Sequence, residues 1–114
     1  MFSFTDRPTY DMKLVAVMSL DAYRDELHQL FRERQIEVFS EIDIQGYHHS
    51  QTAAPGVSLG WFGRASTPAY STLAWAFLAD EQAETLMDAI DAFNDERSLT
   101  NPVRAVQMPV DRMV

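Results

Sequence analysis

The sequence predicts a single α+β domain, residues 1–114, in which two strand–helix–strand units follow one another in a βαββαβ arrangement. Two short apolar runs, residues 13–20 and 71–79, have the length and composition of strands. Each run precedes a stretch with helical spacing of its apolar residues. The Gly- and Pro-rich connection between the units, residues 46–69, is far longer than the usual connection of about four to six residues. Such a loop on a compact sheet indicates a binding or regulatory role.

The first unit begins after a polar lead-in, residues 1–11. Ser19 or Asp21 can cap the helix that follows the first strand. Apolar side chains at helical spacing then form one stripe: Tyr23, Leu27, Leu30 and Phe31. Residues 37–45 alternate in polarity as a half-exposed strand does. The apolar set of this strand is Val38, Ile42 and Ile44, and the polar set is Glu41, Asp43 and Gln45.

The second unit repeats this plan. Its strand, residues 71–79, is apolar throughout, and Asp80 is a suitable N-cap for the next helix. The apolar face of that helix consists of Ala83, Leu86, Met87, Ile90 and Phe93. The helix is expected to end near Arg97, before Pro102, and residues 103–110 form the last strand.

The strand patterns predict the topology. The first and third strands are apolar on both faces, as central strands are, whereas the alternating second strand suits an edge. Right-handed crossovers then give an antiparallel, ferredoxin-like sheet of order 4-1-3-2 with both helices on one face. The other face receives Val15, Val17, Trp75 and Phe77, or their alternates. Either a self-associating oligomer or the long loop must cover it.

Composition limits the function classes. A chain of 114 residues with net charge −8 lacks the clustered basic residues of a general nucleic-acid surface. It contains no cysteine, which excludes disulfides and thiol chemistry. No secretory signal is visible, and no apolar run approaches the roughly 18 residues of a membrane span. We therefore expect a cytoplasmic protein without a membrane span.

Three short motifs resemble the PII signal-transduction superfamily, which includes nitrogen regulatory PII proteins and CutA-type proteins. They are MKLV at 12–15, IQGY at 44–47 and VQMPVD at 106–111, in the family's order and with the long loop in the right gap. The resemblance covers residues 12–114 and indicates a divergent member. In nucleotide-binding members a glycine-rich loop precedes the last strand, whereas residues 97–104 here contain no glycine.

The resemblance implies a homotrimeric, non-enzymatic sensor. Such a protein binds a small effector (an anion, a nucleotide or a metal) in clefts between subunits and presents residues 46–69, the T-loop, to a protein target. Gly46 and Tyr47 would form the cleft wall, and Gln51 lies one position after the family's glutamine at the base of the T-loop. Arg104 falls at the position of a phosphate-contacting lysine. No particular cofactor is predicted.

Several residues carry candidate chemistry of their own. Arg104, with Arg97 and Arg64 in support, could hold a phosphate or carboxylate in a bidentate contact; the alternative is a salt bridge to Glu41 or Asp43. These two carboxylates could also act as an acid–base pair or lie solvated at the sheet edge.

His48 and His49 could bind copper, zinc or nickel, in a loop or across subunits, together with Glu41 or Asp43. Adjacent strand residues point to opposite faces, so the pair alone cannot chelate a metal. The alternative is two exposed polar residues, and His28 on the first helix is also expected to be exposed.

Within the long loop, Trp61 and Phe62 are flanked by glycines and followed by Arg64. Aromatic and Arg side chains dominate the energetics of protein interfaces, so these residues could anchor a protein target. Alternatively, the two aromatic rings fold back onto the subunit or its neighbour.

Two other functions remain open. One is a small enzyme, a monooxygenase or isomerase, of the dimeric α+β barrel type, because unrelated functions recur on this scaffold. A trimer would favour the sensor and a dimer the enzyme. The other is a subunit-interaction module that binds no small molecule.

Overall fold

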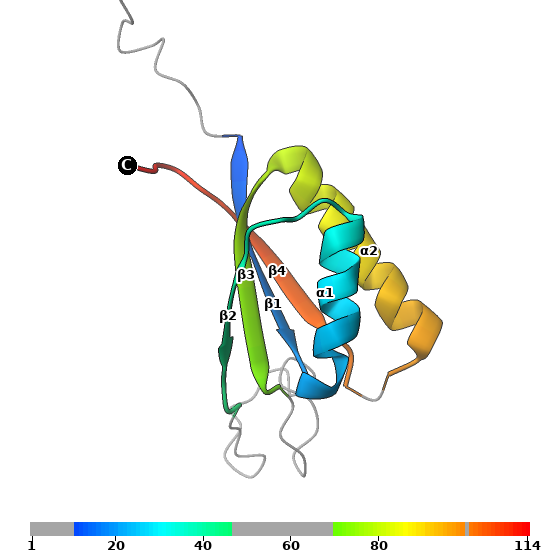
Figure 1. Cartoon of the computed structure of the whole chain (residues 1–114). Coiled ribbons are helices and arrows are strands. Elements are labelled where there is room, and N and C mark those ends of the chain that lie inside the picture. Colours follow the sequence, from blue (N-terminus) through cyan, green and yellow to red (C-terminus); the bar gives the residue numbers. More distant parts are fainter. Residues whose placement is uncertain (1–10, 47–69, 100) are drawn as a thin grey trace, which may run out of the picture.

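The computed structural model describes residues 11–46, 70–99 and 101–114. Its elements are β1 (Met12–Ser19), the short 3-10 helix η2 (Asp21–Tyr23), α1 (Arg24–Glu33), β2 (Ser40–Asp43), β3 (Thr72–Ala79), α2 (Asp80–Arg97) and β4 (Arg104–Pro109). The strands pair antiparallel in the order β2-β3-β1-β4. Both helices lie on one side of this sheet (Figure 1). The predicted ferredoxin-like α+β fold and strand order are therefore confirmed.

The covered face of the sheet is the one beneath the helices, and it holds the hydrophobic core. Because side chains alternate across a strand, every second residue of β1 and β3 reaches this face. The strand residues buried there include Val15, Val17, Ala74, Ala76 and Leu78. The helices contribute Leu27, Phe31, Ala83, Leu86, Ile90 and Phe93. The predicted helix faces are thus confirmed, with Met87, Leu30 and Tyr23 partly buried at the margin.

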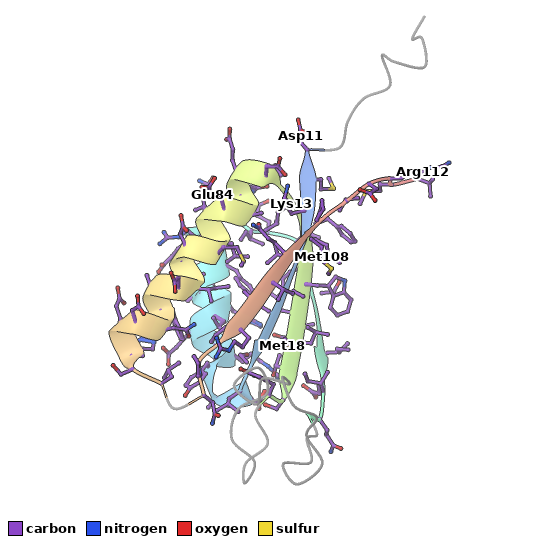
Figure 2. The ribbon with its side chains drawn as sticks, turned by 180° about the vertical axis from the view of Figure 1, so that it is seen from behind. Asp11, Lys13, Met18, Glu84, Met108 and Arg112 are labelled. Carbon is purple, nitrogen blue, oxygen red and sulfur yellow. The ribbon has the colours of Figure 1, made fainter. Side chains whose placement is uncertain are left out.

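The open face of the sheet is the opposite one, and no element among residues 11–46, 70–99 and 101–114 covers it. Cross-strand partners share a face, and the register places Leu14 opposite both Phe77 and Met108. The apolar residues of this face are Leu14, Ala16, Met18, Ile42, Leu73, Trp75, Phe77, Val106 and Met108; Met18 and Met108 are labelled in Figure 2. Phe77 is 50% exposed and Met108 is 46% exposed.

This register corrects one prediction. Val15 and Val17 belong to the covered face, whereas Trp75 and Phe77 belong to the open face. In β1 the alternates Leu14, Ala16 and Met18 take the open positions.

The predicted helix caps are wrong. Asp80 is the first residue of α2, and neither helix start has a side-chain capping hydrogen bond. The carboxylates have other partners: Lys13 Nζ lies 2.8 Å from Asp80 Oδ1, and Arg24 Nη2 lies 2.7 Å from Asp21 Oδ1. Asp21 and Asp80 still occupy first turns, where negative charge favours the helix dipole.

The edge strand β2 is shorter than the predicted 37–45. Val38 is 83% exposed and lies outside the ladder. Beyond Asp43, one further backbone bond joins Ile44 N to Ser71 O at 2.9 Å. Among the residues described, no helix is long and apolar enough to cross a membrane.

Candidate functional site

One end of the sheet brings the predicted site residues near one another. There β1 and β2 end, β3 and β4 begin, and residues 47–69 connect β2 to β3; we call it the loop end (lower end of Figure 1). Gly46 is the last residue described before that segment, and Tyr70 is the first after it. A Cβ added at Gly46 would lie 3.6 Å from Tyr70 O and 3.8 Å from Tyr70 N. These are ordinary contact distances, so the two ends of the segment lie side by side and the space does not itself require glycine.

Tyr70 connects the loop end to β4. Its side chain is 2% exposed, and its hydroxyl donates a hydrogen bond to the Pro102 carbonyl at 3.2 Å. Burial raises the pKa of Tyr70, and a hydrogen bond from the Arg104 guanidinium lowers it in part. Gly46 and Arg104, which the sequence placed in one site, are therefore connected through a tyrosine to which the sequence assigned no function.

The connection between α2 and β4 is fixed by a side-chain amide. Asn94 Nδ2 donates to Val103 O at 2.8 Å, and Val103 N donates to Asn94 Oδ1 at 2.9 Å. Val103 is buried at 2% exposure. Residues 97–104 have no glycine, and the structure holds Val103, immediately before β4, through Asn94. Sequence reasoning missed Asn94, because a polar residue near a helix end carries no specific signal.

The predicted alternative for Arg104, a salt bridge to Glu41 or Asp43, is wrong. β4 and β2 are opposite edges of the sheet, and both carboxylates pair with Arg24 of α1. Arg24 Nη2 lies 2.7 Å from Asp43 Oδ1, and Arg24 Nε lies 3.5 Å from Glu41 Oε2.

Arg24 stands at the centre of a polar group that joins α1 to β2, which we call the Arg24 cluster: Asp21, Arg24, His28, Glu41, Asp43 and Thr72. Burial lowers the pKa of Arg24, but the three carboxylates outweigh it and raise the pKa overall. Glu41 and Asp43 are on the covered face, where both pair with Arg24, and Asp43 at the edge of the sheet is still 85% exposed.

His28 is half-buried, where exposure was expected. Its Nε2 lies 2.9 Å from Glu41 Oε1, and its ring packs against Phe39 and Phe31 at centroid distances of 5.1 and 6.4 Å. Within the described part of the chain, no group of three or more His, Cys, Asp or Glu residues is arranged to hold a metal ion.

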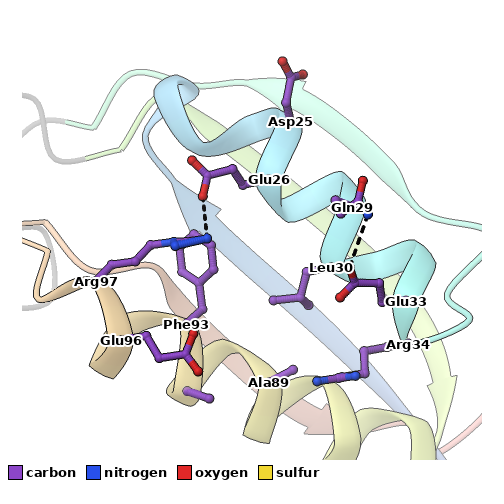
Figure 3. Close-up of a pocket in the computed structure, with 11 residues that line it drawn as sticks. Asp25, Glu26, Gln29, Leu30, Glu33, Arg34, Ala89, Phe93, Glu96 and Arg97 are labelled. Atoms are coloured by element: carbon purple, nitrogen blue, oxygen red, sulfur yellow. Dashed lines mark hydrogen bonds and ion pairs between the residues drawn. The ribbon is translucent and has the colours of Figure 1, made fainter.

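Arg97, predicted to support the anion site, is engaged elsewhere. Its guanidinium pairs with Glu26 of α1 at 2.7 Å and lies 4.2 Å above the Phe93 ring. Both contacts border a groove of about 420 Å³ between the two helices (Figure 3). The remaining predicted residues lie outside the described part of the chain: Tyr47, His48, His49, Gln51, Trp61, Phe62 and Arg64.

Comparisons with known proteins agree with this fold. No protein-family model matches the sequence, and no curated protein matches it either. A DUF3240 family protein from Shewanella baltica OS155 is similar in structure, with a TM-score of 0.62 and 15% identity over 91% of this chain and 94% of that chain.

A second similar protein is CPII from Thiomonas intermedia K12, described as a nitrogen regulatory PII-like protein. Its apo form has a TM-score of 0.51 and 12% identity, over 90% of this chain and 92% of that chain. The form bound to ADP and bicarbonate has a TM-score of 0.51 and 14% identity, over 89% of this chain and 88% of that chain. The chain thus has the fold of PII-like proteins, as the sequence motifs predicted.

Proposed function

We propose that the protein is a PII-like regulatory protein that binds a small anionic effector at the loop end and presents residues 46–69 to a protein target. The observation that carries this proposal is the connection of Gly46 to Arg104 through Tyr70. It places an arginine beside the base of the segment expected to contact the target.

The chemistry of Arg104 suits a phosphate or a carboxylate-like anion. A guanidinium presents a planar set of donors that matches either group in a bidentate contact. The related CPII was solved with ADP and bicarbonate, and also with ADP, AMP and acetate. We therefore take adenine nucleotides and bicarbonate as the first effectors to test, with Tyr47 and Gln51 as further contacts.

The open face supports a homotrimer as the second part of the proposal. Nine apolar residues share this face, and exposed apolar areas of this kind mark interaction surfaces. Subunits packed through this face would form clefts between them, near their loop ends. In the cytoplasm such a trimer would offer Trp61, Phe62 and Arg64 to its target.

Calorimetric titration of the purified protein with ADP, AMP and bicarbonate tests the effector. We expect binding by the wild type and a loss of about 10- to 100-fold in Arg104→Ala, the range for a hydrogen bond to a charged group. Arg112→Ala, which removes an exposed arginine near the C-terminus, is the matched control and should bind normally. Absence of binding by the wild type to all three would overturn the effector proposal.

Two further measurements test the alternative functions, the barrel enzyme and the metal-responsive sensor. Sedimentation should give the mass of three chains; a dimer would favour the barrel enzyme, for which the comparisons offer no support. Copper or zinc binding that is lost in the paired His48→Ala and His49→Ala variant would instead favour a metal-responsive sensor.

A further inference from the structure

Tyr70 contacts both sides of the proposed anion site. Its backbone lies against Gly46, and its hydroxyl meets Pro102 and Arg104. A hydroxyl has one hydrogen, which here goes to the Pro102 carbonyl. The contact with Arg104 must therefore run from the guanidinium to the tyrosine oxygen. The result is a directed chain from Arg104 to Tyr70 to Pro102.

The far end of this chain is held firmly. The proline ring fixes φ at Pro102 near −65°. The next residue, Val103, is buried and makes two backbone hydrogen bonds to the Asn94 side chain at 2.8 and 2.9 Å. The carbonyl that accepts from Tyr70 therefore belongs to a segment anchored to α2, and Tyr70 is itself 2% exposed. A buried hydroxyl that makes two hydrogen bonds has little freedom to move.

We propose that Tyr70 is a positioning residue for the anion site: its hydroxyl, held by Pro102, orients the Arg104 guanidinium toward the effector. This inference rests on the proposed function, in which Arg104 contacts the anion. A free arginine side chain samples many rotamers. Orientation before binding reduces the rotamer entropy lost when the effector arrives, which raises affinity without adding a contact to it.

Tyr70→Phe tests the role because it keeps the buried ring and removes the hydroxyl that accepts from Arg104 and donates to Pro102. We expect ADP to bind Tyr70→Phe roughly 3- to 10-fold more weakly in calorimetric titration, the scale of one hydrogen bond. Tyr23→Phe is the matched control. Tyr23 is half-buried, with its ring 6.2 Å from the Phe93 ring. Loss of its hydroxyl should leave the affinity for ADP unchanged.

A double-mutant cycle distinguishes positioning from general stabilisation. If Tyr70 acts through Arg104, Tyr70→Phe should not weaken ADP binding further in the Arg104→Ala background. An equal loss in both backgrounds would overturn the inference. NMR relaxation at Arg104 Nε should show larger motion in Tyr70→Phe, and unchanged motion would count against it.

Failure of the proposed function and failure of the positioning role would give different binding results. If the wild type binds neither ADP nor bicarbonate, the effector proposal fails and the inference fails with it. If the wild type binds ADP and Tyr70→Phe binds equally well, only the positioning role is overturned.

Discussion

The two faces of the sheet are built from the same strands but are completed in different ways. On the covered face, β3 presents the small residues Ala74 and Ala76, and the helices supply larger side chains such as Leu86. On the open face, β3 presents the large residues Trp75 and Phe77 to solvent, with Phe77 50% exposed. The first face is closed by the two helices, and the second contains apolar surface that residues 11–46, 70–99 and 101–114 leave unburied.

The difference teaches how stability and assembly are divided. Changes on the covered face should lower the free energy of unfolding of each subunit. In the proposed trimer, changes on the open face should act on association, because the partners of its side chains would lie in another copy. The margins of the covered face are held by polar contacts: the Arg24 cluster beside β2 and Tyr70 at the loop end. Substitutions there should lower the free energy of unfolding by less than substitutions in the core.

The largest effect is expected from Leu86→Ala, which removes a core side chain that is 2% exposed. Loss of buried contacts and the resulting cavity should lower the free energy of unfolding by about 2–5 kcal/mol. Urea denaturation at one fixed protein concentration measures it. Val38→Ala, at a site that is 83% exposed, should change little. A loss in Leu86→Ala no greater than in that control would contradict the assignment of the core.

Phe77→Glu should break the assembly and leave the subunit folded. A carboxylate buried at an interface without a partner is costly, so the proposed trimer should dissociate. Sedimentation at micromolar protein would then give the mass of one chain, with native circular dichroism. Gln82→Glu adds the same charge on the exposed surface of α2 and should leave the mass unchanged. An intact oligomer in Phe77→Glu would show that the open face is not the interface.

Arg24→Ala should loosen the β2 margin of the covered face. It leaves Asp21, Glu41 and Asp43 without their arginine, so we expect a smaller stability loss than in Leu86→Ala. The loss of unfolding free energy in Arg24→Ala relative to the wild type should shrink at about 1 M salt, where the screening length is only ~3 Å. Arg32→Ala makes the same change in net charge on α1 as the control. Equal losses in both variants at low salt would mean that the cluster contributes no specific stability.

The smallest effect concerns alkaline pH. Burial raises the pKa of Tyr70 above the value of about 10 expected in the unfolded chain, with Arg104 opposing part of the rise. The native state then keeps the proton at a pH where the unfolded state has lost it. The stability linked to this group is complete below about pH 10 and is lost as pH rises through the native pKa.

Tyr70→Phe cannot ionise at this position, so its stability should fall less steeply than that of the wild type above about pH 10. Urea denaturation between about pH 8 and 11 measures the slope. Tyr23→Phe is again the control. Parallel curves for the wild type and Tyr70→Phe would contradict the burial of the phenol.

Periodicity was sufficient to predict the strand order and the buried side of each helix, because these depend on local patterns. It could not tell which half of β1 faces the helices. Residues 14–18 are apolar in both alternating sets, and the polar residues Lys13 and Ser19 at the ends of the run belong to the set that faces the helices, so polarity does not mark the outer face. Val15 and Val17 were therefore grouped with Trp75 and Phe77, with the alternates of all four left open for the other face, whereas the register puts the two pairs on opposite faces.

The polar contacts were harder to predict for a different reason. Glu41 and Asp43 bind Arg24, and Tyr70 bonds to Pro102, which lies 32 positions away. Such pairs form only after the sheet has brought distant segments together, and a single sequence carries no trace of them. The cap predictions were wrong because Asp21 and Asp80 are already the first helical residues, with Leu20 and Ala79 at the N-cap positions, and their carboxylates pair with Arg24 and Lys13.

The contact between Gly46 and Tyr70 has a consequence for the evolution of the chain. Gly46 and Tyr70 lie next to each other, so any segment that joins them has to span the same short distance, whatever its length. Doubling the length of a flexible loop adds only about 0.6 kcal/mol to its closure cost. A change in the length of the segment should therefore cost the scaffold little, and under the proposed function it would change the surface offered to a target.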